Sequence, residues 1–514
     1  MSSNKKTIIN VICSIMVLFT NVIINFFLSP YIVKNIGVEA NGFIILANNF
    51  VMYAQLIVAA LNSMAGRFIS IEYIRGNYKK ANLYYNSVFW GNLIIVAILI
   101  IPAIISIYKL DMLIDIPPNI LFDVKLLFGF VFFNFFITTG LPNWDCGTYI
   151  SNRLDRSYIP QMITSILRCV LIFGMFTLLT PKVYYVGLIA TIVTILLLIC
   201  NAYNTHKLTP ELKISLNIKK IIFSGRATKE LVESGIWNTI SSVGNILLSG
   251  LDLIICNIFL GATSMGVLSL AKIIPNYMQQ LSASLRGAVA PELTINYALE
   301  KKDEIFKSIN KSMKLTSVIM TIPIAIIVVL GDSFFALWVP SQDAKLLAIL
   351  SVLSILGYMF TSGTQILYNV FEVANKVKEN SIAMIISGII SITITILLAK
   401  FSKFGIFAVA GVSTLINLIR NMTFTLPATA KYLGFKWNIF YKQVIQTIIS
   451  SILLICCGYI IKMIIPSNTW IMFIICGSVI GVIGILINGF LILNKEERIF
   501  LANKILNKIK KLKN

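Results

Sequence analysis

The sequence is dominated by long apolar stretches, each about 20 residues or longer, separated by short charged segments. Hydrophobic residues make up 57% of the 514 residues and charged residues 12%, about half of the charged share of soluble domains. Such a chain needs a bilayer as solvent, and an apolar run of this length without strand alternation spans it as a helix. We therefore predict an all-α polytopic membrane protein with about 14 transmembrane helices. The predicted helices occupy 7–33, 42–66, 82–108, 121–145, 158–180, 182–203, 229–260, 264–288, 306–331, 344–370, 380–400, 404–428, 440–463 and 468–494.

The basic residues predict the orientation of these helices. The formal net charge is +22, and 43 Lys and Arg residues are present. If the N-terminus is cytoplasmic, 32 of them fall on the inner side, eight on the outer side and three inside helices. This asymmetry follows the positive-inside rule and places both termini in the cytoplasm. The basic excess then reflects topology and contact with anionic lipids, and no nucleic-acid partner is indicated.

Two similar glycine-containing interruptions indicate an internal duplication. Gly37 and Gly42 lie between the first two predicted helices, and Gly261 and Gly266 recur at an offset of 224 residues between the seventh and eighth. Glycine permits the backbone torsions of a short turn between helices. Six helices per half give a parallel repeat, as in many transporters. The predicted organisation is a six-helix bundle at 1–203, a cytoplasmic connecting loop and hinge at 204–228, a second six-helix bundle at 229–428, helices 13 and 14 at 429–494, and an amphipathic basic tail on the cytoplasmic face at 495–514.

Polar residues recur on single faces of several predicted helices. In the second helix, Asn48, Gln55 and Asn62 are seven residues apart, which places them on one face. Such faces line a wet cavity in one interpretation and form hydrogen bonds between helices in the other. The remaining stripes are Asn238, Ser242, Asn245, Ser249 and Asp252; Lys272, Asn276, Gln279 and Ser282; Ser354, Tyr358, Thr361, Gln365 and Asn369; and Ser413, Asn417, Arg420 and Asn421.

Four charged residues lie deep within predicted helices. A cation at the centre of a bilayer costs about 3 kcal/mol on insertion scales, so Arg168, Arg420 and Lys272 each need a partner or a task. Asp252 and Lys272 flank the Gly261 turn at matching depth, so we expect them to form an ion pair or to face one cavity. Cations that face a cavity favour an anionic substrate, because Arg and Lys bind phosphate oxygens. Alternatively, each cation extends to a headgroup or binds backbone carbonyls.

The sequence lacks the usual marks of an enzyme or metalloprotein. The eight cysteines all fall within or at the ends of helices, and His206 is the only histidine, so no metal site or disulfide framework is predicted. No phosphate-binding loop of an ATPase, no serine–histidine–acid set and no paired carboxylates are present. We therefore expect a protein that is not an enzyme and needs no cofactor.

Several segments resemble the multidrug/oligosaccharidyl-lipid/polysaccharide exporter superfamily, and more narrowly the bacterial flippases for O-antigen or capsule repeat units. The resemblance rests on FFLSPYIVKNIG, LDLIICNIFLGATSMGVLSL, LRGAVAPEL and ANKVKEN followed by FGIFAVAGVS, and it spans nearly the whole chain. It implies transport of a polyprenyl-diphosphate-linked oligosaccharide across the bacterial cytoplasmic membrane by two rocking halves. It also implies a monomer, with polysaccharide polymerase and glycosyltransferases as further partners.

The resemblance implies a cationic central cavity, and other members of the superfamily remain alternatives. The cavity candidates are Arg168, Asn245, Asp252, Lys272, Asn276, Gln279, Gln365 and Arg420. A lipid II flippase would carry buried basic residues in the first helix, and this chain has none there. A cation-coupled drug antiporter would carry acids inside the N-terminal half, where only Asp145 is found near an inner end. A membrane glycan polymerase or glycosyltransferase would need a large outer loop or an acidic cluster.

Overall fold

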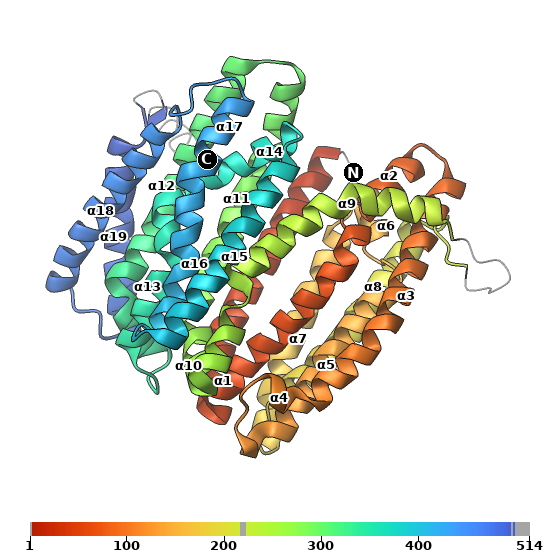
Figure 1. The fold of residues 1–514 in the computed structure, drawn as a ribbon, viewed down its shortest axis with the longest axis horizontal. Helices are drawn as coiled ribbons and strands as arrows, with labels where there is room; N and C mark the ends of the chain where they lie inside the picture. The colour runs from red at the N-terminus through yellow and green to blue at the C-terminus, as the bar shows by residue number, and fades with distance from the viewer. Residues whose placement is uncertain (1–2, 216–222, 495–496, 499–514) are drawn as a thin grey trace, which may run out of the picture. The chain divides into compact units, whose positions relative to one another are not determined.

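The structure is a computed structural model that describes residues 3–215, 223–494 and 497–498, and every regular element in this part is helical (Figure 1). Large apolar side chains such as Ile101, Leu178 and Met463 are exposed on the helices, as expected where lipid is the solvent. The chain divides into two compact units. The first unit contains the residues up to Ile246 together with Cys256–Gly266, and the second contains Leu247–Ile255 and the residues from Val267 onward.

Twelve helices in the described residues are long and apolar enough to cross a membrane. Two of them, Ile12–Ile74 and Gly225–Ala271, are 63 and 47 residues long. Each contains a glycine with non-helical torsions, Gly37 (φ 88°, ψ 167°) or Gly261 (φ 87°, ψ 169°), where the sequence predicts an outer turn. A straight helix of 63 residues would be about 95 Å long, about three times the hydrocarbon thickness. The all-α polytopic prediction is confirmed with twelve candidate spans, and the count of fourteen crossings stays a prediction.

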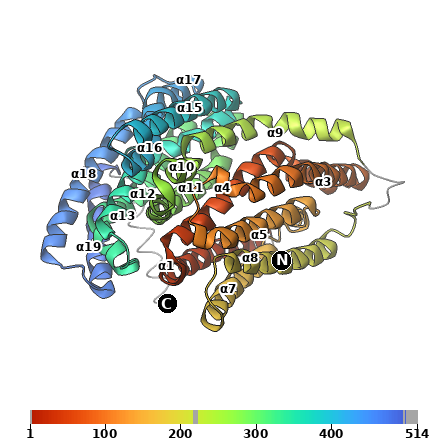
Figure 2. The ribbon, with the colours of Figure 1, turned by 60° about the horizontal axis from the view of Figure 1, so that its bottom comes forward.

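The first unit is built around the kinked helix α1, which packs against α7 and α9, while α5 packs beside α8 (Figure 2). Gly235 lets α9 approach α1 closely, since a Cβ there would lie 2.2 Å from the carbonyl oxygen of Ala60. This helix belongs by sequence to the second predicted bundle but packs in the first unit. The elements are α1 (Ser3–Asn62), α2 (Ala65–Ile74), α3 (Tyr78–Tyr108), α4 (Leu110–Leu113), η1 (Pro118–Ile120), α5 (Leu121–Gly140), α6 (Cys146–Ile150), α7 (Asp155–Leu178), α8 (Tyr184–Leu208), α9 (Gly225–Asn245) and the middle of α10 (Asp252–Ala271).

The connection between the predicted halves is held on helix α3 by two asparagine side chains. Asn82 donates to the carbonyl of Glu211 at 2.7 Å and accepts from the amide of Lys213 at 2.7 Å. Asn86, one turn further along, donates to the carbonyl of Lys213 at 2.9 Å and accepts from the amide of Ser215 at 2.8 Å. The connection is also shorter than the predicted 204–228, because α8 continues to Leu208 and α9 begins at Gly225. Its residues 216–222 lie outside the described part.

The second unit is organised by the long helix α12, which contacts α11, α13, α18 and α19 (Figure 2). Polar side chains attach α19 to its neighbours: Asn488 donates to Thr321 of α12 at 2.9 Å and accepts from Ser450 of α18 at 2.5 Å. Buried amide–hydroxyl bonds of this kind replace the hydrophobic drive that lipid removes. The elements are η3 (Ile246–Gly250), the two ends of α10, α11 (Ile273–Ala298), α12 (Lys302–Trp338), α13 (Ala344–Thr361), η4 (Gly363–Leu367), α14 (Tyr368–Val373), α15 (Val377–Phe401), α16 (Ile406–Arg420), η5 (Asn421–Thr425), α17 (Leu426–Tyr432), α18 (Tyr441–Ile464) and α19 (Trp470–Leu491).

The predicted domain boundaries follow the sequence repeat, whereas the compact units follow packing. The first boundary by packing falls after Ile246, within the seventh predicted helix at 229–260. The boundaries at 203, 228 and 428 therefore stay predictions. Of the predicted amphipathic tail, 499–514 lies outside the described residues, and only Glu497 and Arg498 of 495–514 are described. The Glu497 carboxylate forms an ion pair with Lys314, a buried residue of α12, with 2.9 Å between Oε2 and Nζ.

Candidate functional site

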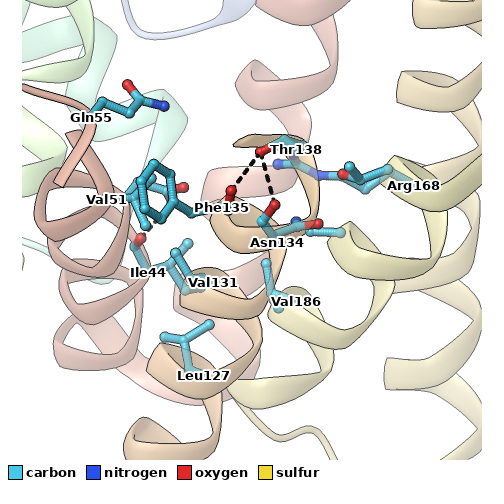
Figure 3. Close-up of a pocket in the computed structure, with 14 residues that line it drawn as sticks. Ile44, Val51, Gln55, Leu127, Val131, Asn134, Phe135, Thr138, Arg168 and Val186 are labelled. Atoms are coloured by element: carbon cyan, nitrogen blue, oxygen red, sulfur yellow. Dashed lines mark hydrogen bonds between the residues drawn. The ribbon is translucent and has the colours of Figure 1, made fainter. Parts of the chain in front are cut away.

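A cavity of about 220 Å³ lies within the first unit, between α1, α5, α7 and α8 (Figure 3). At about 30 Å³ per molecule, seven waters would fill this volume, so it has room for a small polar group rather than a whole oligosaccharide. Both polar and apolar side chains line its wall. The lining residues are Ile44, Asn48, Val51, Gln55, Leu127, Val131, Asn134, Phe135, Thr138, Arg168, Val186, Gly187, Ala190 and Thr194.

The polar wall of this cavity comes from helical periodicity. Asn48 and Gln55 are seven residues apart on α1 and both line the cavity, as the predicted stripe on the second helix requires. The third member of that stripe, Asn62, instead exchanges two hydrogen bonds with Asn92 of α3, at 3.1 and 2.9 Å. The same stripe therefore serves both a cavity and a contact between helices. Gly187 brings α8 close to α5, since a Cβ there would lie 3.1 Å from the side chain of Leu127.

Arg168 is the one charged residue among the fourteen that line the cavity, and none of the fourteen is an acid. Figure 3 shows its side chain extending from α7 toward Thr138 of α5. The hydroxyl of Thr138 shares its proton between the carbonyls of Asn134 and Phe135, at 2.9 and 3.1 Å, so its oxygen can still accept a hydrogen bond. A guanidinium among amides and hydroxyls in a low-dielectric wall attracts anions far more strongly than it would in water. The cavity can therefore accept an anionic group and is poorly suited to a cation.

The predicted ion pair between Asp252 and Lys272 is confirmed in the second unit. The Lys272 ammonium donates to the Asp252 carboxylate, and Ser413 of α16 lies 3.5 Å from the same oxygen. Asp252 is only 4% exposed, so the pair is shielded from solvent and its attraction is strong. The two residues stand on either side of the Gly261 turn, and the π-helical segment η3 ends two residues before Asp252. This pairing neutralises the acid, so Asp252 does not offer a free carboxylate to a transported cation.

Arg420 lies at the end of α16 and is buried, with 6% of its surface exposed. Its guanidinium donates to Asn417 at 2.8 Å and to the hydroxyl of Tyr368, and it contacts the sulfur of Met384. No carboxylate of the described residues pairs with it. The π-helical segment η5 begins at Asn421, which accepts a hydrogen bond from Tyr368 at 2.7 Å.

The other predicted site residues occupy less enclosed positions. Asn276 and Gln279 of α11 are exposed, and Gln365 in η4 is half-buried. Asn245, at the end of α9, is exposed and belongs to the first unit. Among the predicted set, the structure therefore pairs the side chains of Asp252 and Lys272, and Asn276 follows Lys272 by one turn of α11.

Several residues of these sites were not predicted from the sequence. Asn134 and Thr138 share a face of α5 at a spacing of four residues, and this short stripe could have been found by the same periodicity argument. Tyr368 lies one position before the predicted stripe residue Asn369, so the stripe did not select it. Its proximity to Arg420 depends on how α14 and α16 pack, which no local pattern encodes.

Comparison with known proteins extends this description. No protein-family profile matches the chain. The chain is 24% identical over 496 residues to the uncharacterized membrane protein EpsK of Bacillus subtilis (strain 168), covering 96% of this chain and 97% of that one. The chain is a multi-pass membrane protein.

Solved structures of transporters share the fold. An inward closed structure of the lipid II flippase MurJ matches with a TM-score of 0.64 and 16% identity, over 98% of this chain and 100% of that one. An inward-facing multidrug resistance MATE family transporter of the MOP superfamily matches with a TM-score of 0.64 and 13% identity, over 80% and 94%. A MOP superfamily transporter from Pyrococcus furiosus matches with a TM-score of 0.61 and 12% identity, over 84% and 96%. The chain therefore has the MOP transporter fold.

Proposed function

We propose that the protein is a flippase that moves a polyprenyl-diphosphate-linked oligosaccharide from the cytoplasmic to the outer leaflet by alternating access. The product would serve the synthesis of a surface polysaccharide such as O-antigen, capsule or exopolysaccharide. One observation carries the proposal: the cavity of the first unit is lined by Arg168 and several amides and hydroxyls but by no acid. The diphosphate supplies the negative charge that Arg168 attracts, and sugar hydroxyls can hydrogen-bond the amides.

The volume of the cavity limits which part of the substrate it can hold. About 220 Å³ holds a headgroup fragment, so the rest of the glycan and the polyprenyl chain must lie outside it. The polyprenyl chain can stay in lipid, which spares the protein the task of burying it. Alternating access then needs two arrangements of the protein that differ in which leaflet the headgroup can enter. The proposed orientation has both termini in the cytoplasm.

The electrostatics favour this function over a cation-coupled drug antiporter. Cation coupling needs a carboxylate that is free to bind and release an ion or proton, and Asp252 is already paired with Lys272. The cavity wall of the first unit also lacks an acid. A lipid II flippase is the second candidate, because the match to that flippase covers 98% of the chain while the multidrug match covers 80%. Both candidates carry a lipid diphosphate and differ in the attached glycan.

Complementation tests the proposed role of Arg168. In a strain that lacks the gene, the lipid-linked glycan that accumulates in the inner leaflet identifies the substrate. Arg168→Lys should retain more export than Arg168→Gln at equal protein abundance. Loss of a charge-assisted hydrogen bond, about 1.5–3 kcal/mol, corresponds to roughly 10- to 150-fold weaker headgroup binding. The control Lys34→Gln removes one exposed positive charge and should export normally. Export at the wild-type rate by Arg168→Gln would show that the cationic-cavity mechanism is wrong.

A further inference from the structure

Two arginines of the second unit converge on one tyrosine ring. Arg286 comes from α11, Tyr368 begins α14, and Arg420 ends α16. The guanidinium carbons of Arg286 and Arg420 lie 5.9 and 5.4 Å from the centre of the Tyr368 ring. The two carbons are therefore within about 11 Å of each other, the sum of these distances. The ring attracts both cations through its quadrupole, which offsets part of their mutual repulsion.

The positive charge of this cluster is not balanced by an acid. Among the described residues, no ion pair includes Arg286 or Arg420, whereas the buried Lys314 and the largely buried Lys272 each have a carboxylate partner. A buried cation without a counter-ion is expensive to maintain in a membrane. Arg420, which is buried, and the partly exposed Arg286 therefore lack the acid partner that Lys272 and Lys314 have.

Arg420 also retains hydrogen-bonding capacity that its neighbours do not use. A guanidinium carries five N–H donors. In Arg420, one terminal nitrogen donates to Tyr368 and Asn417, the other contacts only the thioether of Met384, and Nε has no hydrogen-bond partner although it is buried. A thioether is a weak acceptor. A stronger acceptor near Arg420 would therefore satisfy donors that protein atoms leave poorly satisfied.

The cluster is held in place without any ligand. Asn421 accepts from the Tyr368 hydroxyl at 2.7 Å, and the Asn369 amide donates to the carbonyl of Arg286 at 3.0 Å. The π-helical segment η5 begins directly after Arg420, and such segments are frequent at functional sites. Because these contacts fix the ring and the α11 backbone, an incoming anion would lose little free energy to ordering the site.

We propose that Arg286, Tyr368 and Arg420 form an anion site for a phosphate or diphosphate group, separate from the Arg168 cavity of the first unit. The planar fork of arginine matches phosphate oxygens in a bidentate arrangement, and a phosphate supplies the charge and the acceptors that the cluster lacks. The phosphate can come from a lipid headgroup or from a soluble anion. The site does not depend on the proposed function.

Binding measurements on the purified full chain in detergent micelles test this site. All variants carry Arg168→Gln, so that the cavity of the first unit does not contribute to anion binding. A failure of the proposed function at that cavity would then leave this measurement unaffected. The probes are inorganic pyrophosphate and, separately, polyprenyl phosphate in mixed micelles, each followed by ligand-dependent thermal stabilisation. We expect saturable binding of at least one probe, and Arg286→Gln should raise its Kd roughly tenfold or more. Lys34→Gln in the same background should leave the Kd unchanged.

The two probes separate the possible sources of the anion. Binding of pyrophosphate supports the site and shows that a free anion suffices, and binding of polyprenyl phosphate alone supports a site for lipid headgroups. Arg286 is partly exposed, so Arg286→Gln should fold even if Arg420→Gln does not. No saturable binding of either probe, or an unchanged Kd in Arg286→Gln, would overturn the proposal.

Discussion

Adding one methyl group at Gly266 should disrupt the contact between the two glycine turns of the first unit. A Cβ on Gly266 would lie 2.5 Å from the carbonyl oxygen and 2.8 Å from the carbonyl carbon of Val38. A Cβ on Gly42 would lie 2.9 Å from the Cα of Gly266. These neighbours are backbone atoms, which cannot rotate away as a side chain can. Gly266→Ala must therefore push the segment 37–42 away from the segment 261–266.

The expected magnitude follows from two opposing effects. Overpacking typically costs about 1–3 kcal/mol, whereas replacing a helical glycine with alanine stabilises by about 0.5–1 kcal/mol. Because the clash is with backbone atoms, overpacking here costs about 2–3 kcal/mol and the net loss is about 1–2.5 kcal/mol, which shifts an equilibrium roughly 5- to 70-fold toward the state with the turns apart. One polar contact between the same segments, the hydrogen bond from Thr263 to Glu39 at 2.9 Å, would break together with the backbone contact.

Cysteine accessibility measures this separation. A cysteine at Ser264, in a background without accessible native cysteines, should react with a membrane-impermeant maleimide several-fold faster in Gly266→Ala than in the parent. Gly129→Ala is the matched control, because a Cβ at Gly129 of α5 meets nothing within 4 Å. Thermal unfolding in detergent should show Gly266→Ala as the less stable variant. Equal labelling rates and equal thermal stability in the two alanine variants would refute this account of the turn contact.

Three further predictions address the ion pair, the connecting segment and the topology. The charge-swapped double mutant Asp252→Lys with Lys272→Asp should recover part of the transport that either single neutralisation loses, and a double mutant no better than the worse single one would contradict simple pairing. Asn86→Ala removes two hydrogen bonds to the connecting segment, of about 1 kcal/mol each, so limited proteolysis should cut this segment faster than in the parent. A cysteine at Ser264 should be labelled from outside the cell, whereas one at Lys378 should need permeabilised cells; the reverse pattern would invert the predicted orientation.

Features set by local backbone geometry could be predicted from the sequence. The offset of 224 residues relates Gly37 to Gly261, and their torsions agree within two degrees (φ 88°, ψ 167° and φ 87°, ψ 169°). Only glycine adopts this conformation readily, so the residue type reveals the turn. The same offset relates Glu39 to Thr263 and Gly42 to Gly266, and both pairs are in direct contact. In a two-fold arrangement, equivalent residues touch only near the axis, which is where the predicted duplication would place these two turns; the duplication itself stays a prediction.

Features set by long-range packing could not be predicted in the same way. A polar stripe shows which face of a helix is polar, but it does not show whether that face meets water or another amide. Asn48 lines a cavity while Asn62, fourteen residues later on the same face, bonds to Asn92. Likewise, Arg420 was selected because a buried cation needs a partner, and the partners found are Tyr368 and Asn417 rather than an acid. Those partners depend on packing between helices that sequence periodicity does not encode.

The hinge predicted at 204–228 stays a prediction, but the structure holds the described part of this loop in place. The loop 204–228 is the natural hinge if the two sequence repeats move as bodies, but Asn82 and Asn86 tie its described residues to α3, and α9 packs on α1. By packing, the chain passes between the two units after Ile246, Ile255 and Gly266, and the first of these points lies at the start of the π-helical segment η3. A π-helical segment has an irregular hydrogen-bond ladder, so it can change its torsions at lower cost than the α-helix around it. One of the three crossings therefore lies in a segment that can bend at low cost, and this segment ends two residues before the ion pair that begins at Asp252.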